Sequence, residues 1–236
     1  MNSNIEIRRF TTLSEQSLAR NIFDTTWQMD SGTEITSNLL QAMVHSGSYL
    51  SGAFIAGECV GAAFAFPATN DGVHLHSHMT AVLDSYRDQG VGYALKIDQW
   101  RWAKEHSFAE ITWTFDPLVS RNARFNLMKL GVDVTDYLPN FYGEMADALN
   151  AGDESDRLLV SWKTDTQAVQ AKEISKLNLE LCKLIAIPED IVEIRRKDKS
   201  ESMKWRLRVR TELKSALDNG GKIIGFTDKN EYVLHI

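Results

Sequence analysis

The stretch Arg87-Asp88-Gln89-Gly90-Val91-Gly92-Tyr93 constrains the fold more than any other part of the sequence. Residues 73–83 before it alternate apolar and polar side chains like a β-strand, and the residues after it have helical spacing. A glycine-containing turn between a strand and a helix exposes backbone N–H groups that bind phosphate or pyrophosphate. Gly90 and Gly92 allow the backbone to approach such an anion because they have no Cβ.

This loop differs from the two best-known phosphate loops. It has no Gly-Lys-Ser/Thr, so it is not a P-loop, and it lacks the third glycine of a dinucleotide-binding turn. No Mg²⁺-binding or γ-phosphate-binding residues accompany it, which argues against a nucleotide-binding protein. For the loop in isolation, a tight turn without a ligand is the simpler interpretation. The elements around the loop must therefore show whether it binds an anion.

Composition indicates a soluble globular protein. The 236 residues allow one large domain, or a domain with a small appendage, and 43% of them are hydrophobic. The sequence has no apolar run long enough to span a membrane and no signal-like segment in residues 1–12, so we expect a cytoplasmic protein without a membrane partner. We expect Cys59 and Cys182 to be reduced. The net charge of −6 argues against nucleic-acid binding.

The order of the predicted elements indicates an α/β (α+β) fold. Strands and helices alternate, a hairpin is expected at Gly57-Glu58, and Asn70-Asp71-Gly72 is a strong turn. We expect a mixed, mostly antiparallel central sheet flanked by helices. The predicted strands are residues 5–10, 49–56, 58–67, 73–83, 110–115, 132–137 and 158–162, and the predicted helices are 13–24, 34–46, 91–106 and 120–130.

The loop and the element order together resemble the GNAT superfamily of acyl-CoA-dependent N-acyltransferases. Arg87, Gly90 and Gly92 match the Arg/Gln-x-x-Gly-x-Gly/Ala loop of that family. Val82 stands at the apolar position five residues before Arg87, and Tyr86 matches the residue just before the loop. The resemblance covers residues 5–163, about two-thirds of the chain. It implies acetyl-CoA or another acyl-CoA as co-substrate, and no metal.

The resemblance also implies the cofactor-binding residues. Backbone groups at the end of the strand pair with the pantetheine arm of coenzyme A, and the loop grips its diphosphate. Asn122 lies near the position of a family asparagine, which is Ser120 here. The cofactor-binding set is Ala81, Val82, Leu83, Arg87, Asp88, Gln89, Gly90, Val91, Gly92, Tyr93 and Asn122.

The second half of the family pattern, Asn-x-x-Ala-x-x-x-Tyr-x-x-x-Gly, is matched only in part. Ala123 and Gly131 match, but Leu127 replaces the tyrosine that in the family often protonates the departing thiolate. A thiolate with a pKa of about 8.5 is already a good leaving group, so water or no acid at all would suffice. The side chains that remain candidates for this role are Asn126, Tyr93, Tyr137 and Tyr142.

Three histidines, His74, His76 and His78, occupy alternate positions of one predicted strand and should share a face. An imidazole can accept a proton near neutral pH. In GNAT enzymes with a carboxylate base on this strand, the base lies about eleven residues before the loop, which here is His76. We take His76 as the first candidate base, His78 as the second and Glu58 as a distant one. A hydrogen-bonded polar strand face and deprotonation through water remain alternatives. Three ligands on one strand are spaced too widely for easy zinc binding.

The residues after 164 do not belong to the GNAT pattern. We therefore divide the chain into a GNAT-like domain at 1–164 and a small α/β extension at 165–236, packed on that domain. We expect helices at 167–176, 189–196 and 198–217, a strand at 181–187 and a hairpin at 222–235. Residues 195–214 carry nine Lys/Arg against three Asp/Glu, which we interpret mainly as a solvated helix face. Arg206 and Arg210 lie among apolar residues, so they either pair internally with carboxylates or bind an anionic substrate.

We therefore expect an N-acyltransferase, most simply an N-acetyltransferase, in which the amine of a small acceptor attacks the thioester directly. Direct transfer forms no acyl-enzyme, so neither cysteine should be essential. The alternative is a non-catalytic module that binds CoA or acyl-CoA and has a regulatory role or a role in protein assembly. The sequence does not reveal the acceptor or the acyl length, and a homodimer through sheet edges remains open.

Overall fold

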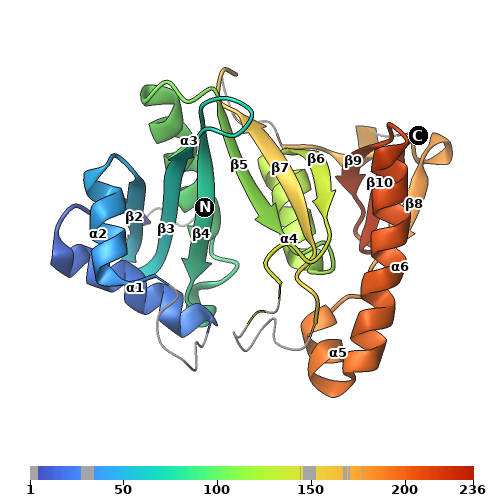
Figure 1. The fold of residues 1–236 in the computed structure, drawn as a ribbon, viewed down its shortest axis with the longest axis horizontal. Helices are drawn as coiled ribbons and strands as arrows, with labels where there is room; N and C mark the ends of the chain where they lie inside the picture. Colours follow the sequence, from blue (N-terminus) through green and yellow to red (C-terminus); the bar gives the residue numbers. More distant parts are fainter. Residues whose placement is uncertain are drawn as a thin grey trace. The chain divides into compact units, whose positions relative to one another are not determined.

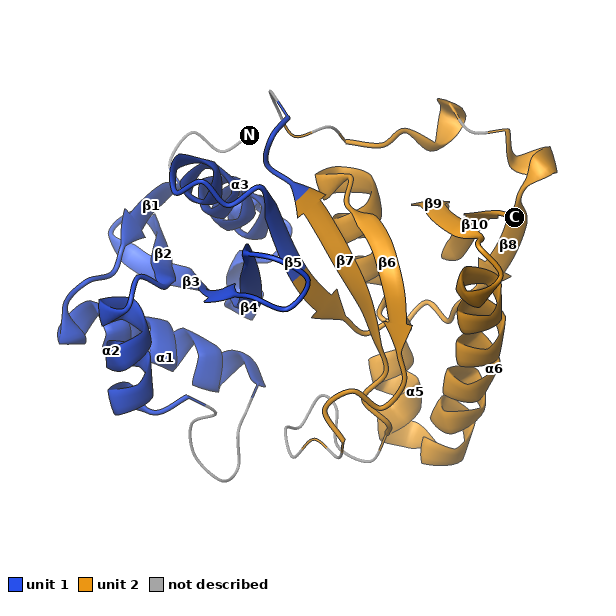
Figure 2. Cartoon of the chain, turned by 45° about the horizontal axis from the view of Figure 1, so that its top comes forward, with its two compact units in different colours: residues 1–112, 163–166 blue, residues 113–162, 167–236 orange. Residues whose placement is uncertain are grey.

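The structure is a computed structural model that describes residues 5–27, 35–143, 145, 153–166, 169, 171–176 and 178–236. The chain divides into two compact units (Figure 2). Unit 1 contains residues 1–112 and 163–166, and unit 2 contains residues 113–162 and 167–236. Each unit is described separately below.

Unit 1 has a sheet whose hydrogen-bonded order is β1-β2-β3-β4-β5, of which Figure 1 labels β2 to β5. The pairs from β1 to β4 are antiparallel, and β4 pairs with β5 in parallel. The predicted elements of this part are confirmed to within a few residues. The strands are β1 (Glu6–Arg9), β2 (Tyr49–Ile55), β3 (Glu58–Ala68), β4 (His74–Val82) and β5 (Glu110–Phe115), which ends in unit 2. The helices are α1 (Leu13–Trp27), α2 (Ser37–His45), η1 (Asp84–Tyr86, 3-10) and α3 (Val91–Glu105).

Local sequence explains these elements. Ile55 pairs with Glu58 across a two-residue loop in which Ala56 and Gly57 have φ of 49° and 84°, as a tight hairpin turn requires. The Thr36 side chain accepts a hydrogen bond from the Leu39 amide and caps α2. The expected start of this helix, Glu34, lies outside the described residues.

Two cores cover the two faces of this sheet. Helices α1 and α2 pack on one face through a buried apolar cluster that includes Phe23, Leu40 and Phe64. Gly61 belongs to the other face, because a Cβ built on it would meet Val91 Cγ1 at 3.1 Å and Leu95 Cδ1 at 3.2 Å, both in α3. This glycine therefore lets the first turns of α3 approach the sheet closely.

In unit 2, the end of β5 is followed by β7 and β6 in the hydrogen-bonded order β5-β7-β6. A separate three-stranded sheet has the order β8-β10-β9. Strands β6 and β7 are antiparallel, and both pairs of the small sheet are antiparallel. The strands are β6 (Asp133–Leu138), β7 (Arg157–Lys163), β8 (Lys183–Ala186), β9 (Lys222–Phe226) and β10 (Glu231–His235). The helices are α4 (Ser120–Arg124), η2 (Phe125–Leu130), η3 (Ile174–Lys176, 3-10), η4 (Leu179–Leu181, 3-10), α5 (Ile191–Lys197) and α6 (Lys199–Asp218).

The C-terminal elements follow their local signals. Asp190 accepts from the Glu193 amide at the start of α5, and Asp198 accepts from the Glu201 amide at the start of α6, each at 3.0 Å. The predicted strand, the two later helices and the hairpin are confirmed. The helix expected at 167–176 lies partly outside the described residues, and its described end is the 3-10 turn η3.

Residues 178–236 share unit 2 with residues 113–162. The Tyr232 hydroxyl donates to the Pro117 carbonyl at 2.7 Å, and Ser120 Oγ donates to the Glu189 carbonyl at 2.8 Å. Side chains on both sides of the predicted boundary at 164/165 therefore contribute to one compact unit. The boundary itself stays a prediction.

The helix expected at 120–130 differs from a plain α-helix. Its second half, Phe125–Leu130, is a π-helix, and Gly131 ends it with φ of 70°. No helix in the described parts of the chain combines the length and the apolar character needed to cross a membrane.

Candidate functional site

The loop before α3 presents a row of unpaired backbone donors. After Arg87 N donates to Asp84 O at 3.2 Å, the next amide to form a hydrogen bond is that of Ala94, which donates to Gly90 O at 2.9 Å. Within the described chain, the amides of residues 88–93 donate to no acceptor. Three of them are the orphan donors of the first turn of α3. This row can hold an anion at the positive end of a helix.

The backbone of the loop is shaped for such a row. Asp88 and Gly90 have φ of 60° and 87°, in the left-handed region that aspartate tolerates and glycine adopts freely. At Gly92 a Cβ would meet only Val82 Cγ2, at 3.8 Å, so this position has ordinary space. Asp88, Gln89 and Gly90 are exposed.

Neighbouring contacts hold the loop in place. The Leu83 amide donates to the Val60 carbonyl at 3.0 Å, and the Tyr86 hydroxyl donates to Glu58 Oε2 at 2.8 Å. Arg87 forms an ion pair with Asp84, and Gln89 Nε2 donates to Ser85 O at 3.1 Å. Glu58, a distant candidate base in the sequence, is thus engaged with Tyr86.

Among the described residues, strand β4 has a long ladder with β3 on one side and a short ladder with β5 on the other. Its parallel ladder with β5 consists of the pairs Leu75–Ile111 and His76–Thr112. The antiparallel ladder with β3 continues to Val82, which pairs with Gly61. The later part of β4, including Ala81 and Val82, is therefore paired on one side and can accept an added extended chain on the other.

A β-bulge at His78 changes the expected alternation of β4. Ser77 pairs with Ala65 and Met79 with Phe64, so the register between β3 and β4 shifts by one residue at His78. As a result, Ser77 Oγ accepts from Lys96 of α3 at 2.9 Å, whereas Met79 packs in the α1/α2 core. The sequence pattern of alternate residues on one face gave no sign of this bulge.

His76 is a half-buried imidazole in an apolar setting. Its ring lies 5.3 Å from the Phe66 ring, and its Nδ1 lies 3.1 Å from Thr112 Oγ1. Burial, aided by the neighbouring His78, lowers the pKa of His76 to about 4. The imidazole is therefore neutral near pH 7, free to accept a proton but weak in holding it.

The other two histidines have different surroundings. His78 is exposed and its ring lies 5.7 Å from Phe66, so it shares an aromatic neighbour with His76. His74 is buried, with Nδ1 3.0 Å from the Gly72 carbonyl. Across the described residues, no group of three or more His, Cys, Asp or Glu side chains could hold a metal ion.

The remaining candidates lie in unit 2. Asn126 is buried and its Oδ1 accepts from Trp113 Nε1 at 3.1 Å. Leu127, at the position of the family tyrosine, is fully buried, and Asn122 is half-buried in α4. Asn126 thus has a structural hydrogen bond, and its amide carries no proton that titrates in the neutral range.

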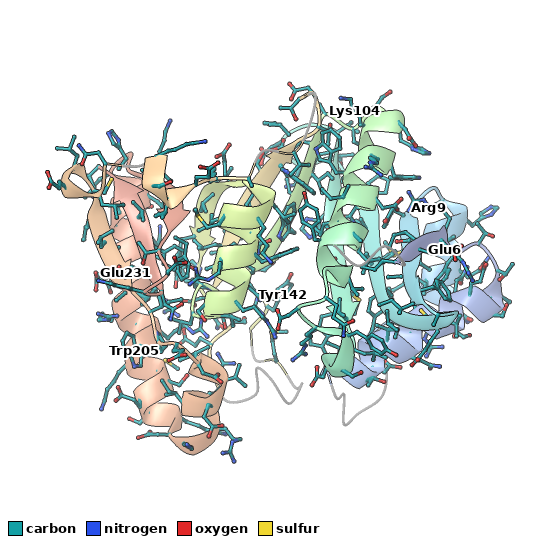
Figure 3. The ribbon with its side chains drawn as sticks, turned by 180° about the vertical axis from the view of Figure 1, so that it is seen from behind. Glu6, Arg9, Lys104, Tyr142, Trp205 and Glu231 are labelled. Atoms are coloured by element: carbon teal, nitrogen blue, oxygen red, sulfur yellow. The ribbon has the colours of Figure 1, made fainter. Side chains whose placement is uncertain are left out.

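Two tyrosines that the sequence analysis left open differ in exposure. Tyr137 is buried, and its hydroxyl donates to Asp156 Oδ2 at 2.5 Å. Burial and this hydrogen bond raise the pKa of Tyr137 above its ordinary value. Tyr142 (labelled in Figure 3) is 41% exposed, and its hydroxyl lies 3.2 Å from Thr114 Oγ1.

Sequence reasoning expected Arg206 either to pair internally or to bind a substrate, but it did not identify the other members of a buried ionic cluster in unit 2. Asp116 and Asp153 are both buried and pair with Arg195 and Arg206. Burial alone would raise the pKa of Asp116, but Arg206 and Arg195 hold it at about 2. In the sequence, Asp116 directly follows the predicted strand 110–115 and precedes Pro117, and nothing there marks it as the partner of an arginine.

The predicted alternatives for Arg206 and Arg210 are thereby decided in favour of internal pairing. Arg206 binds Asp116 and Asp153, and Arg210 pairs with Glu154 and Asp156. Both arginines lie on α6, and all four carboxylates belong to the same unit. Neither guanidinium is left over for a substrate.

Comparison with known proteins gives the family. The chain matches the model of the acetyltransferase (GNAT) family over residues 16–131. A comparison with curated protein sequences finds no significant match.

Solved structures share the fold. The ribosomal-protein-S18-alanine N-acetyltransferase from Escherichia coli superposes with a TM-score of 0.54 at 12% identity, covering 72% of this chain and 99% of that chain. Arabidopsis thaliana Naa50, in complex with the bisubstrate analogue CoA-Ac-MVNAL, gives 0.52 at 18% identity, covering 67% and 97%. A GNAT family acetyltransferase from Elizabethkingia anophelis with acetyl-CoA bound gives 0.50 at 18%, covering 69% and 99%. Through its family domain and this shared fold, the chain belongs to the GNAT acetyltransferase superfamily.

Proposed function

We propose that the protein is an acyl-CoA-dependent N-acyltransferase that moves an acyl group, most simply acetyl, to the amine of a small acceptor. The observation that carries this proposal is the row of unpaired amides at residues 88–93 before and within the first turn of α3. The diphosphate of coenzyme A is an anion of the size and charge that such a row binds.

The cofactor would use unit 1 in two ways. The loop from Arg87 to Tyr93 would hold the diphosphate, and the free edge of β4 at Ala81, Val82 and Leu83 would pair with the pantetheine arm. A bound acetyl-CoA in the E. anophelis relative supports the cofactor class. Asn122 of unit 2 remains a further candidate contact with the cofactor.

Direct attack by the amine fits the state of the cysteines. Burial raises the pKa of the Cys59 thiol, which keeps it protonated and poorly nucleophilic, and its Sγ lies 3.7 Å from Gly61 O. Cys182 lies in unit 2 beside Asn178, with its Sγ 3.4 Å from that carbonyl. The enzyme would contribute mainly by positioning the amine and polarising the thioester carbonyl with backbone groups near Val82.

Proton transfer would involve His76 or water. His76 is neutral and can accept the ammonium proton, and His78 is the second choice. Departure of the thiolate needs no strong acid, because its conjugate acid has a pKa of about 8.5. Leu127 cannot serve as that acid, and the buried Asn126 would act at most through a hydrogen bond.

The experiment compares two substitutions at one position. Gly92→Ala adds only a methyl group in ordinary contact distance, whereas Gly92→Glu places a carboxylate among the amides. We expect Gly92→Ala to keep affinity for CoA, and Gly92→Glu to lose at least about tenfold in calorimetric affinity. A folded Gly92→Glu protein with unchanged affinity would contradict the proposal. Gly90 is less suitable because its φ of 87° strains any side chain.

A non-catalytic CoA-binding module is the second candidate, favoured by the leucine at position 127. Thiol release from acetyl-CoA, measured across a broad panel of amines, separates the two. Amine-dependent thiol release supports the transferase. Thermal stabilisation by CoA without turnover on any amine supports the binding module.

A further inference from the structure

Arg157, the first residue of β7, is a buried guanidinium that forms no ion pair with the residues that the structure describes. It is 7% exposed. Its Nη1 donates to the Asp156 carbonyl at 2.8 Å, and its Nη2 lies 3.0 Å from Met145 Sδ. A thioether is a weak acceptor, so one side of this guanidinium makes only a poor hydrogen bond.

The comparison with its neighbours in unit 2 makes Arg157 unusual. Arg195 and Arg206 are equally buried, and each pairs with Asp116 and Asp153. Although burial opposes it, pairing with these two aspartates raises the pKa of Arg206, whereas burial lowers the pKa of Arg157. Asp116 acts on Arg157 through its charge, but the ion pairs of Asp116 and Asp153 are with Arg195 and Arg206. A buried cation without its own anion is unfavourable unless an anion arrives from outside.

The surroundings of Arg157 are held in a fixed arrangement. The turn at residues 140–143 is fastened to the residues just before Arg157, because the Asn140 amide donates to Asp156 Oδ1 and the Tyr142 amide donates to Ser155 Oγ, each at 2.9 Å. This turn places the Tyr142 ring 5.2 Å from Arg157 Cζ.

Two hydroxyl groups complete the arrangement. The Tyr142 hydroxyl lies 3.2 Å from Thr114 Oγ1, and Tyr142 is 41% exposed, so solvent reaches this side chain. One of these hydroxyls donates to the other, which leaves one hydroxyl proton. This O–H and the guanidinium can both donate to a carboxylate, which accepts several hydrogen bonds at once.

We propose that Arg157, together with the hydroxyls of Tyr142 and Thr114, binds the carboxylate of the acceptor, so that the protein acylates amines that also carry a carboxylate. The assignment of this carboxylate to the acceptor rests on the proposed function, in which the loop amides of unit 1 already serve the cofactor diphosphate. Arg157 is then a specificity-determining residue.

The kinetic test uses pairs of amines that differ only in the carboxylate, each an amino acid and its decarboxylated amine, with saturating acetyl-CoA. We expect wild-type kcat/KM to favour the carboxylate member of at least one pair. Arg157→Gln should lower kcat/KM for that member by about 10- to 100-fold, the worth of a hydrogen bond to a charged group, and leave the plain amine unchanged. Arg157→Lys should restore part of the preference. Arg196→Gln, which removes an exposed guanidinium of the same unit, is the matched control.

Stability of the free protein is a second readout. Arg157→Gln removes a buried charge that forms no ion pair with the described residues, so its thermal midpoint should equal or exceed that of the wild type. Arg206→Gln breaks paired charges and should lower the midpoint. If Arg157→Gln does not fold, Tyr142→Phe and Thr114→Val replace it, and each should reduce the preference by a smaller factor.

The outcomes separate this inference from the proposed function. If no amine is acylated, the proposed function fails, and stabilisation of the wild type but not Arg157→Gln by the same amino acids still supports the anion site. A wild type without preference and without such stabilisation overturns it, as does an Arg157→Gln variant with the full preference. Stronger stabilisation by inorganic phosphate than by any carboxylate, or weaker CoA affinity in Arg157→Gln, also overturns it.

Discussion

Arg206 binds Asp116 through two parallel hydrogen bonds, 2.7 Å from Nη1 to Oδ1 and 2.9 Å from Nη2 to Oδ2. Arg206 is 1% exposed and Asp116 is 6% exposed. The pair joins α6 to the residue that follows β5 within unit 2. Its geometry is the bidentate one that fixes a guanidinium and a carboxylate in both position and orientation.

Breaking this pair should be strongly destabilising. Arg206→Met leaves Asp116 buried with only part of its positive surroundings, so we expect the free energy of unfolding to fall by about 3–5 kcal/mol. Urea denaturation followed by circular dichroism measures the change. Arg196→Met, at an exposed pair with Glu193, should stay within about 0.5 kcal/mol of wild type. A loss below about 1 kcal/mol in Arg206→Met would show that the cluster is not a major contributor.

The same pair predicts how stability responds to acid. The pKa of Asp116 is about 2 in the folded protein against an ordinary 3.8, so the folded state binds fewer protons than the unfolded state between these values. Its contribution is complete above the unfolded pKa of 3.8 and is lost as the pH falls toward 2. Urea titrations at pH values across this window should show a steep fall in wild type. Asp116→Asn should be less stable at neutral pH and respond less to acid, and an equally steep response would assign the effect to other carboxylates.

His76 makes a prediction about catalysis. Its pKa of about 4 means that it stays unprotonated through the neutral range. If it removes the acceptor proton, His76→Gln should lower kcat/KM by about 10²- to 10⁴-fold, and the acidic limb of the wild-type profile should not show a pKa of 6.5 from this group. His235→Gln, at an exposed histidine of unit 2, is the control. Unchanged kcat/KM in His76→Gln would mean that the proton leaves through water.

The lowered pKa of His76 also affects stability. The unfolded chain, with an ordinary pKa of 6.5, binds a proton before the folded chain does, so this contribution is present above pH 6.5 and declines as the pH falls toward about 4. His76→Gln should remove this part of the pH dependence. Thermal midpoints between those pH values, compared with those of His235→Gln at an exposed histidine, would detect it.

Gly61 should tolerate no side chain. A Cβ there would lie 2.9 Å from the Ala81 carbonyl oxygen, 3.1 Å from Val91 and 3.2 Å from Leu95. Gly61→Ala should therefore destabilise the protein by about 1–3 kcal/mol through overpacking and push the start of α3 away from β4. Gly92→Ala, with its nearest contact at 3.8 Å, is the matched control for calorimetric stability and CoA affinity. Equal behaviour of the two variants would indicate that the sheet relaxes without difficulty.

The two cysteines should be dispensable. Direct transfer needs no nucleophilic thiol, and the raised pKa of Cys59 keeps it protonated. Cys59→Ala with Cys182→Ala should keep the wild-type kcat with acetyl-CoA and an accepted amine. Loss of turnover in a folded double variant, with the single variants tracing the effect to one thiol, would point to a covalent intermediate instead.

Much of the fold could be predicted because its signals are local. Alternation marks β4, Gly57 marks the hairpin between β2 and β3, and Asp198 marks the start of α6. The glycines at 90 and 92 mark the loop of the candidate site, where the backbone itself is the binding group. Such features depend on a few neighbouring residues.

The features that could not be predicted depend on distant residues. The bulge at His78 can be recognised only from the pairing of β3 with β4. The residues of the π-helix Phe125–Leu130 do not distinguish it from an α-helix by their composition. Asp116 and Arg206 are 90 residues apart. The sequence therefore indicated that Arg206 could pair with a carboxylate, but it did not indicate which carboxylate. That Arg157 forms no ion pair with a described residue is likewise visible only when the partners of the other arginines are known.

The cluster around Asp116 also has a consequence for the divergence of related sequences. Asp116 and Asp153 need Arg195 and Arg206, which lie in the last quarter of the chain. A relative without α5 and α6 would lack both arginines and leave the two acids buried without a positive partner. We expect such a relative to have neutral side chains at both positions. We therefore expect related sequences to have the two acids and the two arginines together, because replacing one of the four residues alone would leave a buried charge without its partner.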